Sequence, residues 1–395
     1  MWQEYKDLKD YIIGLRREFH RIPEEGNILP KTQARVCEEL DKLGIPYKKG
    51  SEDSSIVALI EGGQPGKVIA LRADMDALPI HEETGLPFAS EHDGFMHACG
   101  HDTHMAMLLG AARILSEHKA ELKGTVKLLF QTGEELANGS RFMLRDKCLS
   151  NPEVDAVFGL HIGSIAGTET PTGVVTAAPG PLMASYDKFV LNIQGTGCHG
   201  STPEKGKDPV VIAANIVLAL EEIIAREIAA PKPAVVTIGK INAGFAYNVI
   251  PGTVVIEGTT RALDEDTRQY LAKRIGEISE NIAHAYGGEC TMEMVWGAAP
   301  VVNNHEMAIL AGDAAAQVVG EENVHRAIPA PIMGGEDFAY FLMEKPGAYL
   351  FLSSANPDIP GATAPHHNCK FTVDEDVLPY GTGTFVALVE KFLNK

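Results

Sequence analysis

The chain has 395 residues, enough for two or three domains, and an apolar content of 45% that is sufficient for large cores. Its formal net charge of −19 argues against nucleic acid or an anionic membrane as a partner. No apolar run reaches the roughly 18 residues that span a membrane, and the charged start is unlike a signal peptide. Six scattered cysteines without a CxxC pair indicate free thiols and a cytoplasmic location.

The first part of the chain alternates helical segments with fully apolar strands. Residues 1–20 and 104–118 have helical spacing, and four apolar runs read as strands: 54–62, 67–79, 124–135 and 154–163. Near the end, 305–319 and 378–393 predict helices and 347–354 predicts a strand. Strands that are apolar on both faces predict an α/β sheet covered by helices on both sides.

The pattern changes near residue 183. An alternating strand at 187–195 precedes a helix that Asp208 caps and Pro209 begins. Two strands, a helix that ends at Gly287-Gly288 and a last strand then follow. The order β-α-β-β-α-β is that of a ferredoxin-like unit. We therefore predict a catalytic α/β domain formed by residues 1–182 and 299–395, with a smaller domain, 183–298, inserted between its parts.

The segment "MHACGHDTH" concentrates groups that bind metals. Cys99 and His101 are two residues apart, so in an extended loop both side chains point to one side. Thiolate and imidazole ligands suit zinc, cobalt, nickel or manganese better than calcium or magnesium. A helix-capping cluster or a structural zinc site remain alternatives, although a structural site would need about four closely spaced Cys or His ligands.

Further polar groups follow the predicted strands. Asp74 and Asp76 end one strand, Glu134 and Glu135 end the next, and His161 ends a third. Ligands of open α/β sheets bind beyond the carboxyl ends of the strands. Adjacent side chains at a strand end point in different directions, so one glutamate can bind metal while the other takes a proton from water. His366 and His367 are two further candidate ligands.

Ordered motifs along the whole chain resemble the metal-dependent amidohydrolase family of N-acyl-amino-acid hydrolases. They include "RREFHRIPEEG", "LRADMDALPI", "MHACGHDTH", "FQTGEE", "GLHIG", "GCHGSTPEKGKDPV", "NVIPGTVVIEGTTR", "GGEDFAYF" and "APHHNCKFTVDED". The resemblance implies a dinuclear metallopeptidase fold, in which the inserted ferredoxin-like domain is a lid that also forms the dimer interface. It also implies two divalent metal ions, which could be Zn, Mn, Co or Ni.

Matching positions imply a role for each site residue. The metal ligands would be Cys99, His101, Glu135, His161 and His367, and His367 is preferred to His366 because it stands four residues before Phe371. Glu134 resembles the general base, and Asp76, or its rival Asp74, the acid that orients a ligand. On the lid, His199 resembles the group that stabilises the oxyanion across a dimer interface. Asn248 and Arg261 resemble groups that bind the substrate carboxylate.

The resemblance implies hydrolysis of the amide bond of a small N-acyl amino acid, by attack of a metal-bridging water that Glu134 deprotonates. The expected assembly is a homodimer, or a dimer of dimers, formed through the lid. A dipeptidase or carboxypeptidase with the same chemistry is the alternative, and a metal-binding protein without turnover is a more distant one. Three positions depart from the common pattern: Thr132-Gly133 before the glutamates, Gly163-Ser164 after "GLHI", and Glu204. These departures leave the acyl group and the amino acid open.

Overall fold

The structure, a computed structural model, describes residues 2–394. The chain divides into two compact units. The first unit comprises Met1–Leu182, Val302–Ile332 and Glu336–Lys395, and the inserted unit comprises Met183–Val301 and Met333–Gly335. Among the described residues, no helix is both long and apolar enough to cross a membrane.

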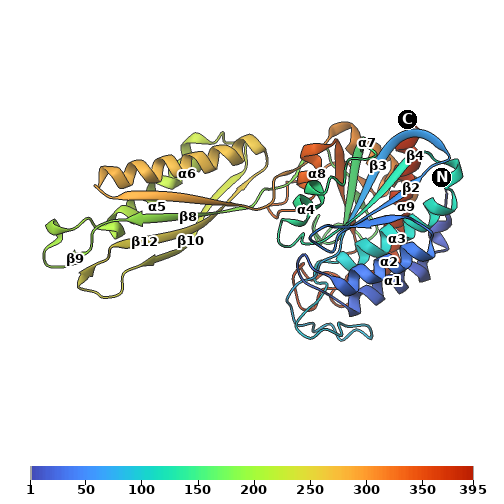
Figure 1. The fold of residues 1–395 in the computed structure, drawn as a ribbon, viewed down its shortest axis with the longest axis horizontal. Helices are drawn as coiled ribbons and strands as arrows, with labels where there is room; N and C mark the ends of the chain where they lie inside the picture. Colours follow the sequence, from blue (N-terminus) through green and yellow to red (C-terminus); the bar gives the residue numbers. More distant parts are fainter. Residues whose placement is uncertain (1, 395) are drawn as a thin grey trace. The chain divides into compact units, whose positions relative to one another are not determined.

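The first unit is built on an eight-stranded sheet with the order β1-β2-β4-β3-β5-β16-β6-β15 (Figure 1). Strand β3 runs parallel to β4 and β5, and β5 runs parallel to β16, whereas β1 and β2 are antiparallel additions at one edge. The strand bounds are β1 Tyr47–Lys49, β2 Ile56–Glu61, β3 Gln64–Asp74, β4 Lys123–Gln131, β5 Ala156–Gly163, β6 Val175–Thr176, β15 Val324–His325 and β16 Gly347–Ser353.

Five helices and the sheet form the main hydrophobic core of this unit. They are α1 Lys9–Arg21, α2 Pro30–Lys42, α3 His101–Glu117, α7 His305–Val319 and α9 Leu378–Leu393. Helix α3 is buried along nearly its whole length, which explains its apolar sequence. Two short helices, α4 Gly139–Arg145 and α8 Ala339–Glu344, pack against each other. Single turns of helix lie at Glu4–Lys6, Lys119–Glu121, Pro203–Lys205, Ile223–Glu227, Glu321–Asn323 and Glu375–Val377.

The inserted unit has an antiparallel sheet with the order β10-β12-β8-β13 and two helices. In chain order these are β8 Asp187–Gln194, α5 Pro209–Glu222, β10 Ala234–Ala243, β12 Thr253–Ala262, α6 Glu265–Ala285 and β13 Glu289–Trp296. The carboxylates of Asp208 and Asp264 cap the two helices by accepting backbone N–H groups. The predicted fold class, an α/β domain with a ferredoxin-like insertion, is confirmed. Two small sheets pair β9 Cys198–His199 with β11 Val249–Ile250, and β7 Gly180–Met183 with β14 Val301–Asn303.

Candidate metal centre

Three parallel strands bring the predicted site residues of the first unit to one edge of the sheet. Asp74, the last residue of β3, lies opposite Gln131, the last residue of β4, and Arg72 lies opposite Gly159 of β5. Residues that follow these positions must therefore emerge at the same edge, as the sequence predicted. Glu134 and Glu135 follow β4, and His161 lies near the end of β5.

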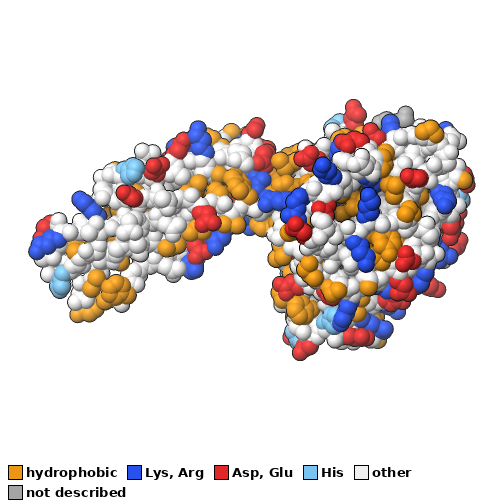
Figure 2. Space-filling view, in the orientation of Figure 1, with side chains coloured by type: hydrophobic (Ala, Val, Ile, Leu, Met, Phe, Trp, Pro, Cys, Tyr) orange, Lys and Arg blue, Asp and Glu red, His pale blue; other side chains and the backbone are white. Residues whose placement is uncertain are grey.

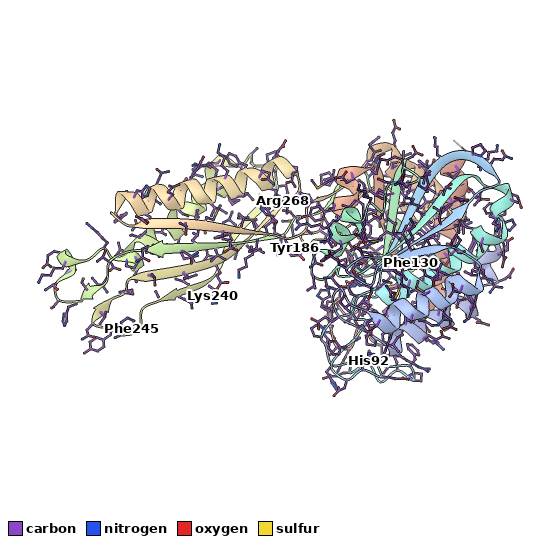
Figure 3. All side chains as sticks on the ribbon, in the orientation of Figure 1. His92, Phe130, Tyr186, Lys240, Phe245 and Arg268 are labelled. Carbon is purple, nitrogen blue, oxygen red and sulfur yellow. The ribbon has the colours of Figure 1, made fainter. Side chains whose placement is uncertain are left out.

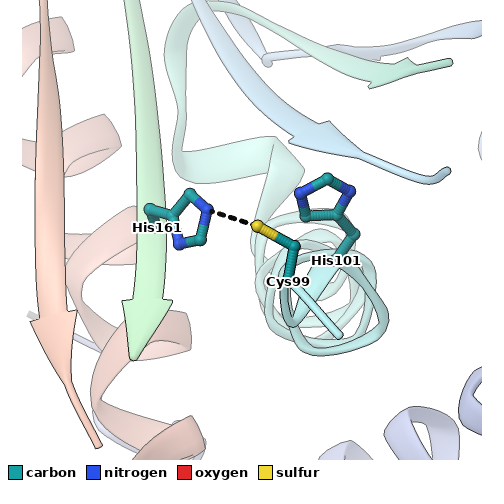
Figure 4. Close-up of side chains that lie close together, drawn as sticks. All are labelled: Cys99, His101 and His161. Carbon is teal, nitrogen blue, oxygen red and sulfur yellow. Dashed lines mark hydrogen bonds between the residues drawn. The ribbon is translucent and has the colours of Figure 1, made fainter. Parts of the chain in front are cut away.

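Cys99, His101 and His161 form a buried triad (Figure 4). One ligand atom from each lies within 4.8 Å of the others, and the Cys99 Sγ is 3.5 Å from the His161 Nε2. Helix α3 starts at His101, three residues earlier than its sequence pattern predicted, so this ligand lies in the first turn. Gly100 precedes it at φ 88°, and a Cβ there would lie 2.7 Å from Ile162. A side chain at position 100 would thus push the helix start away from β5.

A second group of candidate ligands shares Cys99 with the first. Cys99, Glu135 and His367 also place one ligand atom each within 4.8 Å of one another, and His367 Nε2 is 3.2 Å from Glu135 Oε1. His366 lies close as well, with its Nδ1 3.6 Å from the Cys99 Sγ. The structure therefore brings all five predicted ligands together in two overlapping sets, as a pair of neighbouring ions would require.

The histidine hydrogen bonds fit metal ligation. His101 Nδ1 lies 2.7 Å from the backbone oxygen of Asp76, and His161 Nδ1 lies 2.7 Å from the backbone oxygen of Ile162. Each Nδ1 must donate, which leaves the Nε2 lone pair free, as in metal-bound histidines. His101 Nε2 is buried and has no hydrogen-bond partner among the described residues. His161 Nε2 thus presents a lone pair beside the Cys99 thiol, whereas His101 Nε2 lies 3.5 Å from the Asp74 carboxylate. Burial lowers the pKa of His101, but Asp74, Asp76 and Glu135 outweigh it and raise this pKa to about 9.

The electrostatics of the site also favour bound cations. Burial, together with neighbouring carboxylates that include Glu336 and Glu135, raises the pKa of Glu134 well above its ordinary value. Burial, and then Glu135 and Glu134, raise the pKa of the Cys99 thiol in the same way. Burial lowers the pKa of His161, so its imidazole is neutral. A buried group of acids and a thiol that disfavour one another's ionised forms is stabilised by divalent cations.

Asp76 and Asp74 have different partners. The Asp76 carboxylate accepts the backbone N–H groups of Glu134 at 3.0 Å and Glu135 at 3.1 Å, so it fixes the loop that carries both glutamates. It is the Asp76 backbone oxygen that contacts His101. Asp74 lies 2.5 Å from His104 Nδ1 and accepts a hydrogen bond from Arg72 at 2.7 Å. Asp74 Oδ2 also lies 3.5 Å from His101 Nε2, and Asp74, His101 and His104 form a further close group of candidate ligands. Asp76 therefore supports the loop of the two glutamates, whereas Asp74 contacts the histidines of α3.

A buried network of ion pairs lies close to Glu134, and it was not predicted from the sequence. The Arg72 guanidinium contacts Asp74, Glu336 and Asp337 at 2.7 to 3.2 Å, and all four side chains are buried. Glu134, Glu336 and Asp337 also form a close carboxylate group. The signals in the sequence were an arginine inside an apolar strand and the acid pair of "GGEDFAYF". The pairing of Arg72 with Glu336 and Asp337 could not be predicted, because these acids lie 264 and 265 residues away along the chain.

The three predicted residues of the inserted unit fall into two places. His199 and Asn248 lie together and are exposed: β9 pairs with β11, and the Gly200 N–H donates to the Asn248 oxygen at 2.8 Å. Arg261 lies at the other end of β12, where it is half-buried and stacks over Tyr186 at 5.5 Å. Figure 3 shows Tyr186 and Phe245 at opposite ends of this unit. Within one inserted unit, His199 and Arg261 are thus a strand length apart.

Comparison with known proteins shows to which family this chain belongs. Residues 70–391 match the model of peptidase family M20/M25/M40, and the chain belongs to this family. It is 39% identical to an N-acetyl-L-cysteine deacetylase from Bacillus subtilis, over 94% of this chain and 85% of that protein. It is also 39% identical to thermostable carboxypeptidase 1 from Saccharolobus solfataricus, over 99% and 98% of the two chains.

A solved structure of the same family has the same overall fold. A dinuclear metal binding peptidase of the M20 family from Bacillus subtilis superposes with a TM-score of 0.84 at 33% identity, covering 98% of this chain and 99% of that one. The predicted family and the predicted class of enzyme are confirmed: the protein is a metal-dependent amidohydrolase with a site for two divalent metal ions. The identity of the metals and the role of each residue stay predictions.

Helix α1 supports the start of α3 through a buried pair whose strength depends on pH. Asp102 Oδ2 lies 2.7 Å from His20 Nδ1 and 2.8 Å from Arg16 Nε. Burial and Arg16 lower the pKa of His20, but Asp102 and Glu82 outweigh them, and the net pKa is raised above 6.5. The stabilisation from this pair is therefore complete below pH 6.5 and is lost as the pH rises through the folded-state pKa.

We expect His20→Gln to destabilise the protein most at low pH, with a difference from wild type that shrinks as the pH rises. Urea unfolding from pH 6 upward measures this difference. His81→Gln, at an exposed histidine paired with exposed Asp93, is the control and should leave the pH dependence unchanged. A constant difference for His20→Gln at every pH would contradict the assigned charge state.

Proposed function

We propose that this enzyme hydrolyses the amide bond of N-acyl amino acids, with an acetyl, benzoyl or similar acyl group. The observation that carries the proposal is the close set Cys99, His101, Glu135, His161 and His367 beside Glu134, in which Cys99, His101 and His161 are buried and His367 is exposed. The relative named N-acetyl-L-cysteine deacetylase supports this substrate class. A second candidate, removal of a carboxyl-terminal amino acid from a peptide, is favoured by the relative named thermostable carboxypeptidase 1.

The proposed chemistry divides between the two neighbouring glutamates. When bound, divalent metals lower the pKa of water and polarise a carbonyl group. Glu134 takes a proton from the attacking water and later delivers it to the leaving amine. Its burial and its position on a loop held by Asp76 keep the carboxylate in place for both transfers. Cys99, His101, Glu135, His161 and His367 would hold the ions, and thiolate with imidazole favours Zn, Mn, Co or Ni.

Groups on the inserted unit complete the proposed site. His199 donates a hydrogen bond to the oxyanion, and Asn248 and Arg261 bind the free carboxylate of the amino acid. His199 lies on the small β9-β11 sheet, next to the start of β12, whereas Arg261 lies near the end of β12. We therefore propose that a complete site takes these groups from two copies of the chain, in a homodimer or a dimer of dimers.

The inserted unit has a surface suited to such a dimer. Strand β10 is an edge of its sheet, and large apolar side chains are exposed around it: Phe245 is 84% exposed, Leu218 73% and Ile241 50%. Apolar side chains gather near Phe245 (Figures 2 and 3). Exposed apolar side chains beside an unpaired strand edge are typical of interaction surfaces.

All six cysteines are free, which supports a reducing, cytoplasmic location.

The proposed activity is tested with a substrate panel on the metal-loaded enzyme. N-acetyl and N-benzoyl amino acids should be hydrolysed with a higher kcat/KM than dipeptides of the same amino acid. Faster turnover of dipeptides would favour the carboxypeptidase or dipeptidase alternative, and no turnover of either class would reject both. Arg261→Ala should raise KM for free acids and have little effect on their amides, if Arg261 binds the carboxylate.

A shared site predicts that two inactive variants rescue each other. His199→Ala and Glu134→Gln should each be inactive as pure proteins, but mixed dimers would contain one site with both residues intact. We expect activity above either parent after the two proteins are refolded together, measured with an N-acyl amino acid. As a control, His199→Ala refolded with Asn248→Ala should give no recovery, because both changes lie on the same unit of each copy. No recovery in proven mixed dimers of the first pair would rule out the shared site.

A further inference from the structure

A cavity of about 550 Å³ lies on the first unit beside strands β1 and β2, away from the metal centre. It is lined by residues of both strands, by Lys127 of β4 and by the segment from Met143 to Asn151. None of the lining residues belongs to the metal cluster. The volume is within the range of about 300–1,000 Å³ that is usual for small-molecule sites. The cavity therefore has the size of a separate ligand site.

The sheet register gives the cavity an apolar floor with a cation at each side. Lys48 lies opposite Val57, and Leu59 lies opposite Lys127. Directly opposite residues of paired strands project from the same face of a sheet, as do residues two apart along one strand. Lys48, Val57, Leu59 and Lys127 therefore share one face. The intervening residues Ile56, Ala58 and Ile60 project from the other face into the core.

Lys127 is buried without a counter-ion. Only 2% of its surface is exposed, and its Nζ donates to the backbone oxygens of Cys148 at 3.0 Å and Ser150 at 2.7 Å. An ammonium group has three N–H donors, so one remains without a hydrogen-bond partner in residues 2–394. Within residues 2–394, Lys127 forms no ion pair, and Glu153, the nearby acid whose charge acts on it, pairs with Lys345 instead. A buried charge without a partner is costly, and an anion in the cavity would offset that cost.

The rest of the lining is basic as well. Lys48, Lys49 and Lys147 line the cavity and, within the described part of the chain, form no ion pair. The one lining carboxylate, Asp146, already accepts hydrogen bonds from the backbone N–H and hydroxyl of Ser51 at 2.7 and 2.6 Å. Four lysines around one cavity stand out on a chain with a net charge of −19. The local charge selects for anions.

We propose that this cavity binds a monocarboxylate with an apolar body, with the carboxylate between Lys127 and Lys48 and the body over Val57 and Leu59. The inference is independent of the proposed function. A purely structural role for Lys127, which would only hold the carbonyl groups of Cys148 and Ser150 in place, is the competing explanation. The two differ in one respect, because only a binding site needs Lys48 and the open floor at Val57.

Calorimetric titration of the metal-loaded enzyme with octanoate tests this site. We expect saturable binding with a dissociation constant below about 1 mM, and weaker binding of inorganic phosphate and of 1-octanol. Lys48→Met, which removes one cation, and Val57→Trp, which fills the floor, should each weaken octanoate binding at least 10-fold. Lys123→Met is the matched control, because it removes a lysine of β4, the strand that carries Lys127, outside the cavity, and it should bind octanoate like wild type.

Lys127→Met should also lose octanoate binding. If this variant does not fold, the octanoate affinities of Lys48→Met and Val57→Trp test the proposal on their own. Equal binding by wild type and these variants would place octanoate elsewhere, for example at the metal centre, and would overturn the proposal. No saturable binding, or phosphate binding as tight as that of octanoate, would overturn it too. Retained binding in a folded Lys127→Met protein would leave Lys127 with the structural role alone.

Discussion

Glu134→Gln should keep both metal ions and bind substrate, yet turn over at least about 100-fold more slowly, the usual lower limit for loss of a general base. The amide has nearly the shape of the carboxylate but cannot accept the proton of the attacking water. The Asp76 carboxylate would still hold the loop through the backbone N–H groups of residues 134 and 135. Steady-state kinetics and metal analysis of the purified variant measure the two effects separately.

Glu135→Gln is the matched control, since it makes the same chemical change one residue further along. It should instead lower metal content, because this carboxylate lies with Cys99 and His367 in one candidate ligand set. Activity should then follow the metal content and partly return at high metal concentration. The opposite behaviour of the two variants would reverse the assignment of the adjacent acids.

Arg72→Met should be among the most destabilising single substitutions in the first unit. The change removes a buried cation and leaves Asp74, Glu336 and Asp337 without their shared partner. Breaking a buried ion pair costs about 3–5 kcal/mol. We expect either a loss of this size in the free energy of unfolding, measured with urea, or protein that does not accumulate in folded form.

Arg145→Met provides the comparison. Arg145 pairs with Glu52 at 2.7 Å, but both side chains are more than half exposed. Exposed pairs contribute about 0–1 kcal/mol, so this variant should unfold close to wild type. Similar stabilities for Arg72→Met and Arg145→Met would show that the buried network contributes little to folding.

The fold and the convergence of polar groups at one edge of the sheet were predictable because they depend on local patterns, whereas the choice of His367 depended on the resemblance to a known family. Apolar strands separated by helical segments predicted the parallel sheet, and the strand-end rule placed Glu135 and His161 beside Cys99. In the inserted unit, the Asp208-Pro209 helix start and the alternating pattern at 187–195 predicted α5 and β8, which the structure contains. These signals lie within one element each, so no knowledge of distant contacts was needed.

Partners far apart in sequence were not predictable from such patterns. Arg72 is one charged residue in an apolar strand, and nothing in its neighbourhood identifies Glu336 and Asp337 as its partners. The hydrogen bonds of Asp76 to the backbone of residues 134 and 135 depend on a loop conformation rather than on side-chain type. The separation of His199, on the small β9-β11 sheet, from Arg261, near the end of β12, became evident only from the strand pairing.

We propose that catalysis depends on metal ions held by the residues around Cys99. The most direct test is a metal titration of chelator-treated wild-type enzyme, with bound metal and turnover of an N-acyl amino acid measured in the same samples. We expect activity to vanish on chelation and to return with Zn, Mn, Co or Ni as bound metal approaches two ions per chain. Cys99→Ala, folded by circular dichroism, should bind less metal and regain little activity. Full activity in metal-free enzyme, or two tightly bound ions in Cys99→Ala, would contradict this claim.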